Sequence, residues 1–182
     1  MPTKSTRPIS FPVPPPPAHA WWLLGALLLI PIVVVAIAYA QDPAATAMNP
    51  LELCLAVAVF GAVSGITVFG LKRREVEFDG VTLVVKAAMF THRVAAAGLD
   101  LEHARVVDLR ERTDLKPRFR TFGMSLPGFN AGWFRMRGGK KGFCLLTSHE
   151  RVAWVPAREG TDLLVSMKQP QAFLDTLRQG RR

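Results

Sequence analysis

Two apolar runs decide the fold of this chain: WWLLGALLLIPIVVVAIAY at residues 21–39 and LCLAVAVFGAVSGITVFGL at residues 53–71. Each run has nineteen residues and contains no charged side chain. At about 1.5 Å of rise per residue, a helix of this length spans roughly 28 Å, close to the hydrocarbon core of a bilayer. A short segment separates the runs. They therefore predict a transmembrane helical hairpin over residues 21–71, with spans at 21–40 and 51–71.

The basic residues set the expected orientation of this hairpin. They flank the two runs on their outer sides and are missing from the connecting loop at 41–50. These flanking residues are Lys4 and Arg7 before the first span and Lys72, Arg73 and Arg74 after the second. The positive-inside rule then predicts a multi-pass protein of a bacterial inner membrane with both termini in the cytoplasm.

The first run also carries a feature of secretory signal sequences. Ala38-Tyr39-Ala40 has the small-x-small form of a signal-peptidase site. However, the run is longer than the roughly 7–15 apolar residues of a signal sequence, and a second span follows at once. Trp21 and Trp22 at one end and Tyr39 at the other match the aromatic belts of a spanning helix. We therefore interpret the run as an uncleaved span, with a kink expected at Pro31.

Two further patterns concern the hairpin and the segment before it. Gly61 and Gly65 stand at GxxxG spacing, which allows two helices to approach closely. Packing of the two spans within one chain and pairing with a second copy both fit this pattern, and we favour the first. Residues 1–20 hold seven of the fourteen prolines, which predicts an exposed cytoplasmic tail of polyproline II type.

Residues 72–182 change to a β pattern and predict one small domain. Asp79-Gly80 predicts a two-residue turn within a hairpin over residues 75–85. Further strands are expected at 90–95, 104–112, 133–137, 142–147, 151–156 and 162–166, with a long loop at 113–132. A terminal helix begins at Pro170, with Phe173, Leu174 and Leu177 on one apolar stripe. The expected domain is seven or eight antiparallel strands in a partly open barrel, capped by this helix.

This order of elements resembles the bacterial PH (pleckstrin-homology-like) domain family, in its two-span, membrane-anchored type. The resemblance covers residues 75–179. It is carried by Leu126-Pro127-Gly128 and Gly132-Trp133-Phe134, and by the segment from Ser166 through Gln169-Pro170 to Phe173-Leu174. It implies a mainly β, PH-like fold and a cytoplasmic binding role. The basic motif with which eukaryotic relatives bind phosphoinositides is not identifiable, so inositol lipids are not the expected ligand.

A basic cluster is the strongest candidate for a binding site. Residues 110–141 contain nine basic and two acidic side chains, within a chain of net charge +9. Strand alternation places Trp133, Arg135 and Arg137 on one face and Phe134 and Met136 on the opposite, core-facing side. The candidate residues for an anionic partner are Arg118, Arg120, Trp133, Arg135, Arg137, Lys140 and Lys141. A plain solvated face, with Trp133 closing the barrel edge, fits the same pattern.

The sequence offers no catalytic constellation. Its four histidines lack partners at metal-ligand spacing, and its two cysteines, Cys54 and Cys144, lie in different parts of the expected fold. We expect no cofactor, no metal and no enzymatic activity, and a nucleic-acid partner is not expected on this pattern. The sequence thus predicts a membrane protein whose domain binds lipid headgroups or an acidic protein surface. A structural accessory subunit without a ligand is the alternative.

Overall fold

Two long helices dominate one side of the molecule. The computed structural model describes residues 8–41 and 49–180, and within them α1 covers Ala18–Gln41 and α2 covers Pro50–Lys72. Both helices are long and apolar enough to cross a bilayer, and most of their surface is exposed. Pro31 lies inside α1, which continues through it. Ala38-Tyr39-Ala40, which resembles a signal-peptidase site, falls within α1. The loop expected to join the spans lies mainly outside the described residues.

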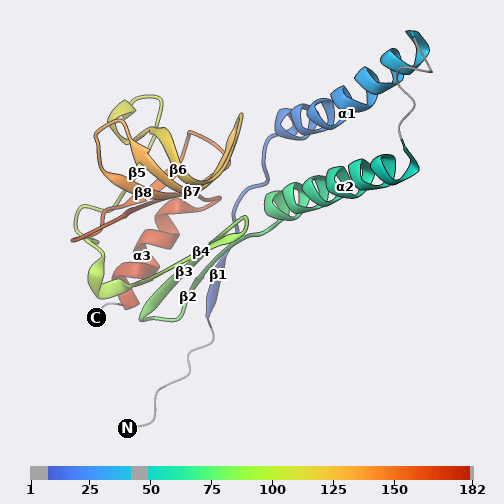
Figure 1. Ribbon diagram of the computed structural model, residues 1–182. Coiled ribbons are helices and arrows are strands. Elements are labelled where there is room, and N and C mark those ends of the chain that lie inside the picture. Colours follow the sequence, from blue (N-terminus) through green and yellow to red (C-terminus); the bar gives the residue numbers. More distant parts are fainter. Residues whose placement is uncertain (1–7, 42–48, 181–182) are drawn as a thin grey trace.

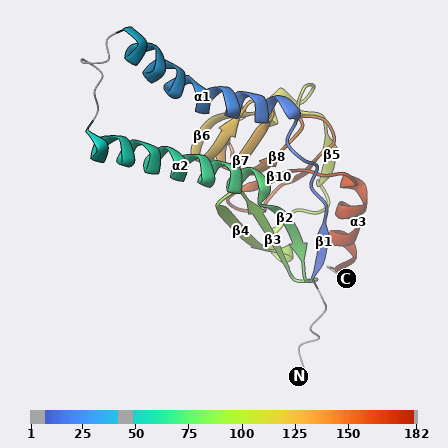
Figure 2. The ribbon, with the colours of Figure 1, turned by 90° about the vertical axis from the view of Figure 1, so that its right-hand side faces the viewer.

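The helices run side by side and leave the domain in the same direction (Figures 1 and 2). At Gly61 and Gly65 the space around the backbone is open, because a Cβ added to either glycine would have no atom within 4 Å. Among the described residues, no atom of α1 therefore packs closely on this motif, as the predicted contact between the two spans would require. The helices instead meet the domain at their inner ends, where Leu24 of α1 and Leu71 of α2 are buried in its core.

The domain contains two sheets. A four-stranded sheet has the order β1-β2-β3-β4, and a six-stranded sheet has the order β5-β9-β10-β8-β7-β6. The strands are β1 Ile9–Phe11, β2 Arg74–Phe78, β3 Thr82–Ala87, β4 Phe90–Ala95, β5 Arg105–Val107, β6 Pro117–Leu126, β7 Phe129–Met136, β8 Lys141–Leu146, β9 Val152–Val155 and β10 Asp162–Ser166. Short 3-10 helices cover Ala96–Gly98 and Thr113–Leu115. Neighbouring strands are antiparallel except β8 and β10, which pair in parallel.

Three expectations about the strands need correction. The described residues contain ten strands in two sheets, not seven or eight antiparallel strands in one partly open barrel. The expected loop at 113–132 is largely the β6–β7 hairpin. Its glycines and alternating arginines interrupt the apolar alternation by which a strand is predicted. The first hairpin turn is shifted by one residue. Because Phe78 pairs with Leu83, the two central residues of the turn are Gly80 and Val81, and not Asp79 and Gly80. Gly80 has the positive φ of 93° that such a turn needs.

Residues 8–17 of the proline-rich segment also do not form a free tail. Residues 9–11 form β1, which pairs with β2 in the register Ser10 to Glu77. Beyond it, the carbonyl of Pro12 accepts a hydrogen bond from the backbone N–H of Lys168. We call residues 8–17 the N-terminal strap, because they connect the edge of the first sheet to the start of α1. Short apolar Ile-Ser-Phe can add to a sheet edge even though prolines follow it.

The terminal helix α3, Pro170–Gly180, lies between the two sheets (Figure 1). Its predicted stripe of Phe173, Leu174 and Leu177 is buried in a core cluster that also contains residues of both sheets. The ring of Phe11 in the strap packs edge-to-face on Phe173, with 5.0 Å between ring centroids. A second, smaller core lies on the other face of the six-stranded sheet, around Phe134 and Met136. The helix therefore joins the strap and both sheets into one unit.

Replacement of Phe173 by alanine should lower the free energy of unfolding by about 3–5 kcal/mol, because a large buried ring is lost from the contact between α3 and the strap. Urea unfolding of the detergent-solubilised chain, followed by tryptophan fluorescence, measures the change. Gln171→Ala on the exposed face of α3 is the matched control and should change little. An unfolding curve for Phe173→Ala that equals the control curve would mean that α3 does not hold the core together.

Candidate basic hairpin on the second sheet

The β6–β7 hairpin is bent by a pair of glycines that face each other across the strands. Gly123 pairs with Gly132, and a Cβ added to Gly123 would lie 2.3 Å from the carbonyl oxygen of Ala131. A Cβ added to Gly132 would lie 2.5 Å from the carbonyl oxygen of Phe122. Gly132 also has φ of 118°, a conformation that other residues rarely adopt. Side chains are thus excluded at this crossing, and the hairpin can curve towards the helices.

The tip of this hairpin contacts the inner ends of the helices and the strap. Met124 of β6 packs so closely on Gly70 of α2 that a Cβ on this glycine would lie 2.8 Å from the Met124 Cε atom. At the turn, Gly128 has φ of 76° and leaves room for Pro17 and His19. The two strands of the hairpin are therefore held against the point where the helices leave the domain.

Six of the predicted site residues lie on this hairpin, on the turn that follows it and at the start of β8. They are Arg118, Arg120, Arg135, Arg137, Lys140 and Lys141, and all six are exposed. None of them forms an ion pair with an acidic residue of the described part of the chain. Cross-strand pairing places Phe119, Arg135 and Lys141 in one row. We call these six cations and the strands that carry them the basic hairpin.

Trp133, the seventh predicted residue, lies in an aromatic cluster between the sheets. Its ring packs edge-to-face on Phe143 at 4.8 Å and on Phe90 of β4 at 5.7 Å, measured between ring centroids. Phe122 of β6 also contacts Phe90, at 4.9 Å. The edges of the two sheets, β4 and β6, therefore meet through aromatic rings. Trp133 is half-buried and does not stand free beside Arg135 and Arg137, although strand alternation places them on the same face.

A shallow hollow of about 490 Å³ opens beside this cluster. It is lined by Thr121, Phe122, Trp133, Phe134, Lys141 and Thr161. Aromatic carbon forms much of its surface, and Lys141 at its side belongs to the same cross-strand row as Arg135. An apolar surface next to unpaired cations suits an amphiphilic anion better than a small hydrophilic one.

The juxtamembrane residues Lys72, Arg73 and Arg74 are at the junction of α2 and β2. Lys72 ends the helix and is exposed, whereas Arg74 is half-buried. The Arg74 guanidinium donates to the Pro14 carbonyl at 3.5 Å, and its Nε atom is buried without a partner in the described residues. Burial lowers the pKa of Arg74. Of these three basic residues, Arg74 therefore contacts the N-terminal strap within the fold.

The sequence reasoning missed the two exposed aromatic rings of β6. The side chains of Phe119 and Phe122 are 59% and 63% exposed. Register shifts interrupt the strand before each of them, between Pro117 and Phe119 and between Arg120 and Phe122. Because these bulges break the period-two pattern, the sequence predicts a loop where the structure has a strand. The aromatic residues interleaved with arginine were the available signal.

Two further observations concern the metal-ligating and thiol groups of the described residues. The described residues contain no group of three or more side chains that could hold a metal ion. Cys144 is fully buried in the second core, and burial raises the pKa of its thiol.

The described residues thus combine two long apolar helices with a small domain of two β-sheets and one further helix. The sequence profile of the family described as Bacterial PH domain matches residues 74–180, which is more than half of the chain. The chain therefore belongs to the bacterial PH domain family, and its two apolar helices fit the membrane-anchored type. No curated protein matches the chain, and no solved structure does.

The aromatic cluster predicts a dependence of stability on pH through His92. This side chain stacks against Phe143 at 5.0 Å between ring centroids, and burial lowers its pKa. An unfolded chain then binds a proton at His92 more readily than the folded chain does. Stability should therefore fall as the pH decreases from about 7.5 to 5.5. His92→Phe should flatten this slope in urea unfolding. A slope equal to that of the parent chain would exclude His92 as its source.

Proposed function

We propose that this protein is a non-enzymatic membrane-anchored binding module. Its PH-like domain faces the cytoplasm from a bacterial inner membrane and binds an anionic partner through the basic hairpin. The observation that carries the proposal is the set of six exposed cations on the β6–β7 hairpin, the turn after it and the start of β8, none of which has an acidic partner in the described residues. By contrast, Lys86 on the first sheet forms ion pairs with both Glu75 and Glu77.

The position of the basic hairpin supports lipid headgroups or an acidic surface at the membrane as that partner. The tip of the hairpin contacts the last residues of α2, where the second span meets the headgroup region. Electrostatic attraction to anionic lipids reaches only about a Debye length, roughly 8 Å at physiological salt. A cation held within this range gains about 1 kcal/mol, so several unpaired cations together produce a measurable affinity.

The experiment uses the full chain in nanodiscs prepared with and without phosphatidylglycerol. The strand β6 is the edge of its sheet, so its outward amides are free to exchange with solvent. We expect anionic lipid to slow the hydrogen exchange of residues 117–126 and added salt to reverse the effect. The variant Arg135→Gln/Arg137→Gln should lose much of this protection. It leaves the sequence of β6 unchanged, so its exchange rates compare directly with those of the parent chain.

The matched control is Arg158→Gln/Lys168→Gln, which removes two exposed cations outside the basic hairpin. It should behave like the parent chain. Exchange in β6 that ignores lipid charge in every variant would contradict binding to anionic lipid.

The second candidate function is that of an accessory subunit in a larger membrane complex. It is favoured by the open surface at Gly61 and Gly65, where another helix could approach α2 closely. Purification in mild detergent would then yield a stoichiometric partner, and substitution of both glycines by leucine would release it. Retention of such a partner by that variant would exclude the glycine face as its binding site.

A further inference from the structure

We propose that the β6 edge inserts Phe119 and Phe122 into the headgroup region of the same leaflet that α1 and α2 enter. The domain would then contact the surface of the membrane that α1 and α2 span. The inference rests on the proposed function, because it names the lipid surface as the partner of the basic hairpin. It adds a contact that charge alone does not supply.

The first observation is the exposure of two neighbouring rings on one face of one strand. Phe119 pairs with Arg135, and Phe122 pairs with Trp133, which lies two residues before Arg135 on β7. The bulge between the two phenylalanines therefore keeps both rings on one side of the sheet. Both are more than half exposed, although the adjacent ring of Trp133 is half-buried. Exposure of two large aromatic rings to water is unfavourable, because burial of their apolar surface would stabilise the protein.

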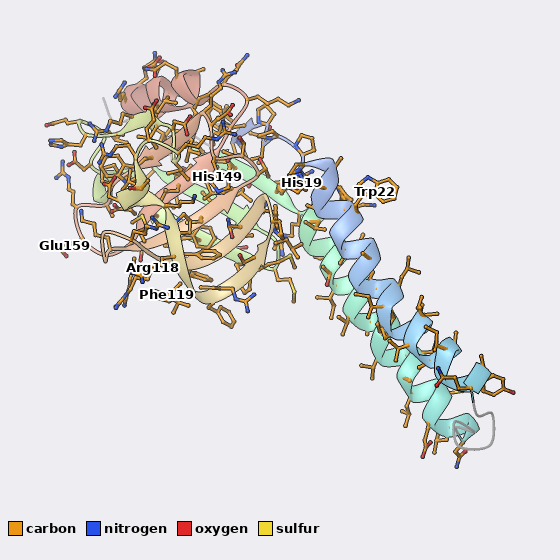
Figure 3. All side chains as sticks on the ribbon, turned by 90° about the horizontal axis from the view of Figure 1, so that it is seen from above. His19, Trp22, Arg118, Phe119, His149 and Glu159 are labelled. Carbon is orange, nitrogen blue, oxygen red and sulfur yellow. The ribbon has the colours of Figure 1, made fainter. Side chains whose placement is uncertain are left out.

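The second observation is the direction in which this edge faces. Figure 3 shows Arg118 and Phe119 on the margin of the domain toward which the helices run, whereas α3 lies at the opposite end. The same strand continues to Met124, which packs on Gly70 two residues before the end of α2. The edge of β6 is therefore tied to the point at which the second span leaves the membrane.

The third observation is the chemistry around the rings. Arg118 and Arg120 flank Phe119 in sequence, and Arg135 and Lys141 continue its cross-strand row. Aromatic rings with cations on both sides are typical of segments that lie in a membrane interface, where the rings pass below the phosphates and the cations bind them. The unpaired backbone groups of an edge strand cannot enter hydrocarbon. Insertion is thus limited to the headgroup layer, with only the rings reaching deeper.

An edge strand can also bind an extended peptide by adding it to the sheet. The arrangement favours the lipid surface, because the register shifts at Phe119 and Phe122 interrupt the regular hydrogen-bonding edge that an added strand requires. A peptide partner remains a distinct outcome of the experiment.

The experiment places a nitroxide spin label at position 119 of the full chain in nanodiscs. The parent for labelling carries Cys54→Ser, because Cys54 is exposed whereas Cys144 is buried. Phe119→Cys is compared with Ala172→Cys, an exposed position on α3. We expect the label at 119 to lose most of its accessibility to a water-soluble nickel complex and to gain accessibility to oxygen. The label at 172 should stay accessible to nickel.

The outcomes separate this inference from the proposed function. Equal nickel accessibility at both positions, together with lipid-dependent exchange in β6, would overturn the insertion and leave anionic binding in place. Loss of both signals would overturn both. Shielding of position 119 only after an acidic peptide is added would assign the edge to a peptide and also overturn insertion. As a second variant, Phe122→Ser should reduce the protection of β6 by anionic lipid, since a polar side chain replaces the inserted ring.

Discussion

The pairing of β1 with β2 is the constraint on which the rest of the structure depends. It brings residues 9–11 beside residues 76–78, although the whole helical hairpin lies between them in the sequence. The chain leaves the first sheet through the strap, extends along α1, and returns along α2 into the same sheet. Both helices must therefore meet the domain at the same side, whether they are surrounded by lipid or by water. In a bilayer this arrangement keeps the first strand and the domain on one side of the membrane.

This closure also limits how the domain can move. The strap contacts α3 through Phe11 and contacts the turn of the basic hairpin through Pro17. Met124 makes a further contact with the end of α2. A domain attached by one flexible linker could turn any face towards the helices, whereas these contacts fix the face that lies there. The position of the basic hairpin relative to the helices is thus a property of the fold.

The sequence predicted the parts of this structure that depend on strong local patterns. The two helices, the strand at 90–95, the strand at 162–166 and the stripe of α3 follow from apolar runs and periodicity. It failed where tertiary contacts decide the conformation. The tripeptide Ile9–Phe11 is too short to predict a strand by itself, and its partner lies more than sixty residues away. The bulges and the paired glycines of β6 and β7 hid a long hairpin in the same way.

For the candidate site, composition identified the cations but not their surroundings. Alternation correctly placed Phe134 and Met136 in the core, and it grouped Trp133 with Arg135 and Arg137. It could not show that the four-stranded sheet covers Trp133 and ends before Arg135, because that depends on how two sheets meet. The exposure of Phe119 and Phe122 was hidden for the same reason.

The pairing of β1 with β2 can be measured most directly by disulfide formation between opposed positions. Ser10→Cys and Glu77→Cys, introduced together in a chain with Cys54→Ser, are placed opposite each other in the register. Our account predicts rapid formation of an intramolecular disulfide in native membranes under mild oxidation, with Ser10→Cys/Glu102→Cys as an unpaired control. Free labelling of the thiol introduced at position 10 by a soluble maleimide, with no disulfide to position 77, would contradict the account.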